Sequence, residues 1–177
     1  MKTQVCCLVV VGAAVLLSGC AGETLVDATG PRPTWVMTPL EPEDGVRFYV
    51  GMAVVRSVLE EREGRRRALA NAAERAASSV AEEVRAQIRE ETGSEGAVAS
   101  GEDRPFASIR DQVEVHSREI IRGILPKEYY YERWRIRPGL LAPSFERYKY
   151  HVLAAFPESE YERLVTGVAG AVRSKDP

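Results

Sequence analysis

The stretch ERYKYHVLAAF, residues 146–156, determines the fold class because two kinds of side chain alternate along it. Apolar and aromatic side chains occupy every second position, at Tyr148, Tyr150, Val152, Ala154 and Phe156. The positions between them begin with polar side chains, at Arg147, Lys149 and His151. Successive side chains of a β-strand point to opposite faces of the sheet, so the pattern predicts a strand with one face on a core.

A second alternating stretch, KEYYYERWRIR at residues 127–137, precedes the first and is separated from it by the turn-forming segment PGLLAPS. The two stretches therefore predict an antiparallel hairpin. One face of the second stretch, which we assign to the core, carries Tyr130, Trp134 and Ile136. The opposite face carries Tyr129, Tyr131, Arg133 and Arg135.

VRFYVGMAVV, residues 46–55, is rich in β-branched and aromatic side chains and predicts a third strand. Gly51 within it indicates a bulge or the close approach of another element. A helix is predicted to follow, because Ser57 and Glu60 have the spacing of a capping box. Small side chains then recur on one helical face and permit close packing on a sheet: Ala68, Ala72, Ala73, Ala76 and Ala77.

The end of this helix is ambiguous, because residues 80–91 fit both a continuing helix and an alternating strand. Residues 92–105 predict a loop, residues 106–121 a second helix, and residues 157–172 a closing helix that begins near Pro157. This order predicts an α+β fold, an antiparallel sheet of three to four strands with helices packed on one face.

The first nineteen residues have the pattern of a secretory signal peptide, with Lys2 followed by an uncharged run over residues 5–17. The run is shorter than the roughly 20 residues that span a bilayer. Leu17-Ser18-Gly19-Cys20 resembles the lipobox of bacterial lipoproteins, which predicts that Cys20 is lipidated and begins the mature chain. The alternative is a buried apolar helix that ends in Ser-Gly-Cys. In lipoproteins an aspartate after the cysteine favours the inner membrane, so Ala21 favours the outer membrane.

Residues 20–44 contain Pro31, Pro33, Pro39 and Pro42 and predict an extended tether. Such a tether would reach at most about 80 Å. Trp35 within it is expected to dock on the domain or on a partner. The remaining residues, 45–177, are enough for one domain with one core.

The composition and motifs of the chain argue against several classes of function. Its 24 Lys and Arg residues against 26 Asp and Glu residues argue against nucleic-acid binding. His116 and His151 are the only histidines, and neither has metal-ligand spacing to a cysteine or another histidine. We therefore predict no catalytic residues, no metal and no cofactor.

The most suggestive surface is the predicted strand face with Tyr129, Tyr131, Arg133 and Arg135. Tyrosine and arginine are enriched at interaction hot spots, and aromatic rings also stack on sugars. We interpret these four residues as a hypothetical binding site. The alternative is that the tyrosines only cover a neighbouring loop.

Several segments together resemble the small outer-membrane lipoproteins of the LPP-twenty and FlgP type, with a relative in the amino-terminal domain of FlgT. They are the lipobox with Cys20, Pro33-Thr34-Trp35, FYVGMAV, RRRALANAAERAASSV, REIIRGI and YKYHVLAAFPESEY. The family usually has Gly-x-Gly in the first strand, where this chain has Gly51 and Ala53. The resemblance implies a membrane-tethered, periplasmic domain without catalytic residues, and it favours a strand over residues 80–91, so we place the helix end near Ser79.

Two functions are predicted on this basis. The first is a non-enzymatic lipoprotein of the outer membrane that assembles with itself or with other envelope components, including a flagellar machine. The alternative is a module that binds peptidoglycan or a cell-wall synthase. A third hypothesis, an envelope hydrolase, is supported only by the predicted location in the envelope.

Overall fold

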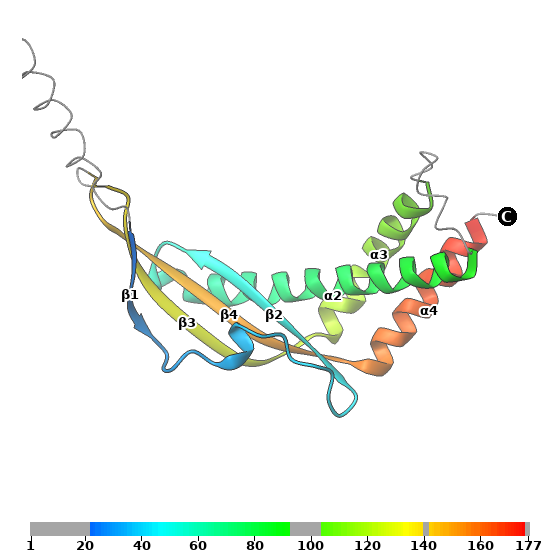
Figure 1. Cartoon of the computed structure of the whole chain (residues 1–177), viewed down its shortest axis with the longest axis horizontal. Helices are drawn as coiled ribbons and strands as arrows, with labels where there is room; N and C mark the ends of the chain where they lie inside the picture. Colours follow the sequence, from blue (N-terminus) through cyan, green and yellow to red (C-terminus); the bar gives the residue numbers. More distant parts are fainter. Residues whose placement is uncertain (1–21, 93–103, 140–141, 176–177) are drawn as a thin grey trace, which may run out of the picture.

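The computed structural model describes residues 22–92, 104–139 and 142–175 of the chain (Figure 1). The predicted signal peptide, residues 1–19, and the lipidation site at Cys20 lie outside the described residues.

Four antiparallel strands form a single sheet in the order β1-β3-β4-β2. They are β1 (Gly22–Ala28), β2 (Val46–Val55), β3 (Leu125–Arg137) and β4 (Phe145–Pro157). β3 and β4 form the predicted hairpin, in which Tyr131 pairs with Tyr150, and β2 pairs with β4 along its whole length. The predicted α+β fold with a three- to four-stranded antiparallel sheet is therefore confirmed.

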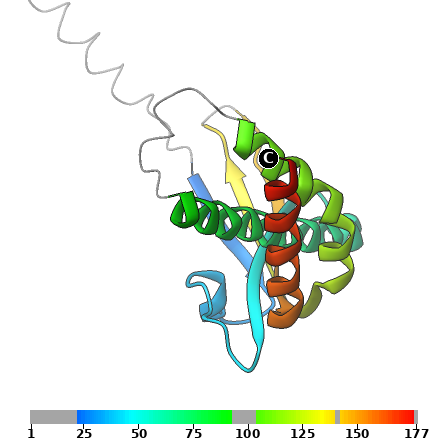
Figure 2. The same cartoon turned by 90° about the vertical axis from the view of Figure 1, so that its right-hand side faces the viewer.

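One face of the sheet is covered by α2 (Glu61–Thr92), whereas α3 (Arg104–Gly123) and α4 (Glu158–Lys175) lie mainly beyond its end and pack on the far part of α2 (Figures 1 and 2). Two 3-10 turns, η1 (Thr34–Val36) and η2 (Val58–Glu60), precede β2 and α2 respectively. Ser57 is the predicted cap, and its Oγ accepts a hydrogen bond from the Leu59 amide at 3.2 Å. Beyond the sheet, α2 packs against both α3 and α4, which also contact each other.

The main core lies between the sheet and the helices. The predicted apolar face of β4 is buried there, with Tyr148, Tyr150, Val152, Ala154 and Phe156 all nearly inaccessible. The small side chains of α2 pack against this face, and Ala68, Ala72 and Ala76 are completely buried. The alternation of residues 146–156 therefore indicated the correct face.

Gly51 marks the point at which α2 comes closest to the sheet. A Cβ atom at this position would lie 1.9 Å from the Ala68 carbonyl oxygen and 2.6 Å from the Ala72 amide nitrogen. The β2–β4 register runs through Gly51 without interruption, so the glycine accommodates a close approach and not a bulge. Only a residue without a side chain fits between these two backbones.

The predicted helix end near Ser79 is wrong, because α2 continues as a helix to Thr92. Val80 and Val84 are fully buried in the core cluster that also contains Ile109 of α3 and Val168 of α4. These two helices supply an apolar surface beyond the edge of the sheet, and helical spacing places Val80 and Val84 against it. The fourth strand is instead supplied by Gly22–Ala28.

The predicted tether needs a similar correction, because its described part, residues 22–44, lies on the domain. β1 pairs with β3 from Gly22 onward, although nearly all its side chains are exposed. Trp35 is 5% exposed and packs with Tyr130 and Leu153 on the face opposite the helices. Its indole nitrogen donates to a Glu128 carboxylate oxygen at 2.9 Å. Trp35 therefore docks on the domain itself.

Replacing Gly51 by alanine tests the approach of α2 to β2. We expect Gly51→Ala to lower the free energy of unfolding by about 3 kcal/mol or more, because rigid backbone surrounds the new methyl group. Gly167→Ala is the matched control: this exposed position in α4 has open space, and alanine should stabilise the helix by about 0.5–1 kcal/mol. Denaturant unfolding of both variants measures the difference, and an unchanged midpoint for Gly51→Ala would contradict the packing.

Replacing Trp35 tests whether the amino-terminal segment belongs to the fold. Trp35→Ala should destabilise the domain by about 3–5 kcal/mol, as truncation of a buried aromatic side chain does. Met37→Ala, in the same segment but 68% exposed, should leave the unfolding midpoint nearly unchanged. Equal midpoints for the two variants would show that the segment is free in solution.

Candidate functional site

The four residues predicted to form a binding face do share one face of β3, but that face points toward the helices. Tyr131 lies beside Tyr150 of the core, with ring centroids 6.0 Å apart. The guanidinium of Arg65, from α2, lies 5.1 Å from the centre of the Tyr129 ring. The prediction that this face points away from the helices is therefore wrong.

The arginines of this face are engaged within the domain. Arg133 lies 3.7 Å from Asp27 of β1 and 3.9 Å from Glu146 of β4, and Arg135 lies 3.7 Å from Glu146. The Tyr131 hydroxyl donates to Asp27 at 3.3 Å. These contacts connect β1, β3 and β4, and as partly exposed ion pairs they contribute little stability individually.

The opposite face of the sheet, which we call the outer face, carries Tyr130, Glu132, Trp134 and Ile136 of β3. Tyr130 is buried as predicted, but against Trp35 and not against the helices. Trp134 is only half-buried, so its predicted place in a dry core is wrong. The amino-terminal segment covers the part of this face around Tyr130, where it takes the place of a helix.

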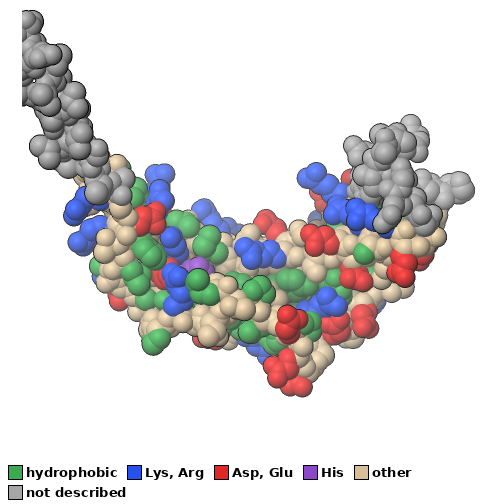
Figure 3. All heavy atoms as spheres, viewed as in Figure 1, with side chains coloured by type: hydrophobic (Ala, Val, Ile, Leu, Met, Phe, Trp, Pro, Cys, Tyr) green, Lys and Arg blue, Asp and Glu red, His purple; other side chains and the backbone are tan. Residues whose placement is uncertain are grey.

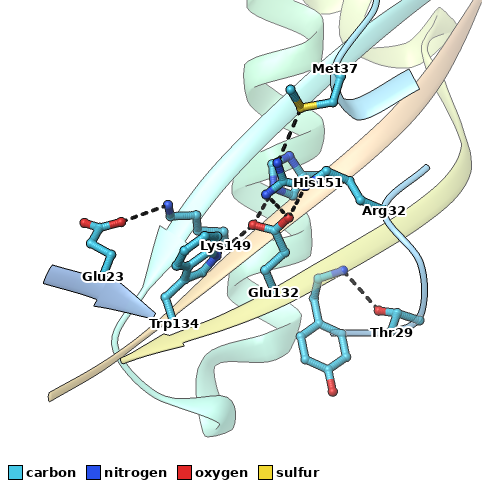
Figure 4. Close-up of polar contacts among 9 residues, drawn as sticks. Glu23, Thr29, Arg32, Met37, Glu132, Trp134, Lys149 and His151 are labelled. Carbon is cyan, nitrogen blue, oxygen red and sulfur yellow. Dashed lines mark hydrogen bonds and ion pairs between the residues drawn. The ribbon is translucent and has the colours of Figure 1, made fainter. Parts of the chain in front are cut away.

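Glu132 is the most unusual residue of the outer face, because a carboxylate that is 1% exposed needs a partner for each oxygen. One oxygen accepts a hydrogen bond from Arg32 Nε at 2.6 Å, and the other accepts from Trp134 Nε1 at 2.7 Å (Figure 4). Arg32 belongs to the amino-terminal segment, so the carboxylate joins that segment to the sheet. The hydrogen bond to Glu132 raises the pKa of Arg32.

His151 lies next to this pair, with Nε2 4.0 Å from a Glu132 oxygen (Figure 4). Burial lowers the pKa of His151, and the nearby cations Arg32 and Lys149 lower it further, while Glu132 acts in the opposite direction. Its Nε2 is buried and has no hydrogen-bond partner in the described part of the chain. The imidazole is therefore neutral at pH 7.

Lys149 completes the cluster on the open side. Its ammonium group lies 4.4 Å from the centre of the Trp134 ring and 3.5 Å from a Glu23 oxygen of β1 (Figure 4). Trp134 thus presents a ring between a cation and β1, where Leu25 is its paired neighbour. This arrangement suits contact with another surface better than proton transfer, because both oxygens of Glu132 already accept hydrogen bonds.

Exposed apolar side chains also lie on the outer face, on both edge strands of the sheet and on β3, with basic side chains of β4 between them. We call this group of side chains the outer-face patch and define it by Leu25, Met52, Val54 and Trp134. Leu25, Met52 and Val54 are 47%, 44% and 42% exposed. Figure 3 shows apolar side chains interspersed with basic ones over the half of the molecule in which β1 begins, on the left of the view. The patch lies on paired strands, so its side chains are held in place.

Two further properties of the described residues bear on the site. No three acidic, histidine or cysteine side chains among them are grouped so that they could hold a metal ion. Of the helices described, none has the length and apolar composition needed to cross a bilayer.

Comparison with protein-family models, with curated proteins and with solved structures found no match for this chain. The resemblance to the LPP-twenty and FlgP lipoproteins stays a prediction.

The Glu132 cluster was missed at the level of sequence, although one signal was present. Alternation places Glu132 on the same face as Tyr130 and Ile136, the face that was assigned to the core. A carboxylate on a buried face requires a cationic partner, but sequence pattern alone does not identify Arg32, which is a hundred residues away.

The neutral His151 predicts a dependence of stability on pH. Its folded pKa lies below its unfolded value of about 6.5, so the unfolded chain binds the proton first. The contribution to stability is complete above about pH 6.5 and falls as pH decreases toward the folded pKa. We expect the melting temperature to decrease between pH 7.5 and 5.5, and His151→Leu to flatten this decrease. Parallel curves for the two proteins would contradict the assignment.

Proposed function

We propose that this protein is a lipid-anchored structural component of the bacterial envelope, held at the outer membrane by acylated Cys20. Its domain assembles through the outer-face patch with copies of itself or with another envelope protein. The role is one of scaffolding, without a reaction of its own.

The observation that carries this proposal is the position of β1. The first strand begins at Gly22, only two residues after the predicted lipidation site, so the anchor lies within about 7 Å of the sheet. Backbone pairing with β3 and the packing of Trp35 connect the anchor to the core. A domain attached so closely takes a defined orientation at the membrane, which suits a component of an ordered assembly.

The outer-face patch supports the assembly part of the proposal. Exposed apolar side chains on one face of a sheet, here Leu25 beside Trp134 and Met52 beside Val54, are typical of interaction sites. Lys149 and Arg147 lie beside Trp134 in the neighbouring strand, and an apolar surface with polar groups at its rim has the composition of a protein interface. The alternative, binding of peptidoglycan or a cell-wall synthase, rests on Tyr129 and Tyr131, and the packing of these rings toward α2 removes that support.

The proposal is tested in cells with the full-length chain. Cys20→Ala should abolish lipid labelling and change membrane fractionation, because the thiol that carries the acyl chains is gone. Met52→Glu with Val54→Glu should keep lipidation but strongly reduce the crosslinked complexes formed from a photoreactive residue at position 25. Val115→Glu, at a position that is also exposed to solvent but lies on α3, is the control and should leave the complexes intact.

Normal lipid labelling of the Cys20→Ala variant would refute the anchor. Unchanged crosslinked complexes in the double variant would refute assembly through the outer-face patch.

A further inference from the structure

The end of the sheet nearest Cys20 gathers the ends of all four strands. Gly22 at the start of β1 pairs with Arg137 at the end of β3. Phe145 at the start of β4 pairs with Ile136, and Val55 at the end of β2 pairs with Tyr148. The antiparallel topology therefore places side chains from distant parts of the sequence around the point where the chain enters the sheet.

Four arginines are concentrated at this end, and we call the group the basic end: Arg56, Arg135, Arg137 and Arg147. Arg56 and Arg147, together with Phe145 and Glu146, line an open hollow of about 460 Å³. The Arg147 guanidinium lies 5.3 Å from the centre of the Phe145 ring, which is 42% exposed. The exposed Phe145 ring and the Arg147 guanidinium thus lie together at this end of the sheet.

The basic end is not neutralised within the domain. Arg56 and Arg137 are exposed, and neither forms an ion pair with any carboxylate of the described residues. Of the nearby carboxylates, Glu146 lies near Arg133 and Arg135, and Glu23 pairs with Lys149. Positive charge is therefore left over at this end of the sheet.

The opposite end of the sheet has the opposite charge. The loop that precedes β2 carries the exposed side chains of Glu41, Glu43 and Asp44. Figure 3 shows acidic side chains at this loop and basic side chains at the end where β1 begins. The domain is therefore electrically polar along the sheet, with the positive end next to the predicted anchor.

We propose that the basic end lies on the headgroups of an anionic phospholipid bilayer. This inference rests on the proposed anchor, because acylated Cys20 would hold Gly22 within about 7 Å of the lipid. Guanidinium groups bind phosphates through two parallel hydrogen bonds, and an exposed phenylalanine ring inserts favourably at the boundary between headgroups and acyl chains. The acidic loop then points away from the negative surface, so both ends favour the same orientation.

The basic end is tested first without the anchor. Residues 22–177 contain every described element and the whole core, and their binding to vesicles of phosphatidylglycerol and phosphatidylethanolamine can be measured by sedimentation. We expect binding that falls with added salt and is nearly absent with phosphatidylcholine vesicles. Each arginine near an anionic surface contributes about fivefold, so Arg56→Gln with Arg137→Gln should lower the partition coefficient roughly thirtyfold.

Arg110→Gln with Arg122→Gln is the matched control, because it removes the same charge from exposed positions on α3. It should bind nearly as well as the wild type. Equal losses in the two double variants, or equal binding to both kinds of vesicle, would overturn the proposal.

The orientation is tested with the lipidated full-length protein. A fluorophore on Ser144→Cys, beside Phe145, should be quenched by a quencher attached to lipid headgroups, whereas one on Glu41→Cys should not. Equal quenching at the two positions would overturn the inference. Absence of acylation at Cys20 would instead refute the proposed function, and the vesicle measurements would still decide whether the basic end binds anionic lipid.

Discussion

The contact between α2 and β2 at Gly51 is the constraint on which the other packing depends. Because no side chain separates the strand from Ala68 and Ala72, the helix lies directly on the sheet. A 32-residue helix in this position extends beyond the sheet, where it provides the surface for α3 and α4. Side-chain contacts then hold α4 in place: the Tyr161 hydroxyl donates to the Ser79 carbonyl, and Arg47 of β2 pairs with Glu158.

The outer face is organised by a different interaction, the buried carboxylate of Glu132. Removing a carboxylate from water is unfavourable unless hydrogen bonds replace its hydration, and here Arg32 and Trp134 supply them. Because Arg32 lies in the segment that follows β1, this requirement favours one position of the segment on the sheet. Apolar packing of Trp35 on Tyr130 acts in the same direction. Together these two interactions hold the amino-terminal segment on the domain, although the composition of this segment is typical of a tether.

A short connection between the proposed anchor and a rigid sheet would have consequences for function. A long tether would let a domain sample many orientations, whereas two residues allow few. In the proposed arrangement the basic end contacts the bilayer, the outer-face patch faces sideways for assembly, and the helices extend away from the end where β1 begins (Figure 1). The lipid attachment, the charge of the basic end and the outer-face patch would then all be consistent with one orientation of the domain at the membrane.

Local pattern in the sequence determined the hairpin, β2 and the helices after Ser57, because periodicity depends only on neighbouring residues. The anchor at Cys20 follows from a short motif and stays a prediction. Local pattern also determined the buried face of β4, where apolar and basic side chains alternate. β3 has aromatic side chains on both faces, so only the position of α2 decided which face meets the helices. Residues 80–91 fitted two periodicities until α3 and α4 supplied a surface for the helix. β1 buries almost no side chain, so its sequence has no apolar alternation. It is a strand because its backbone pairs with the distant strand β3, an interaction that local sequence pattern does not indicate.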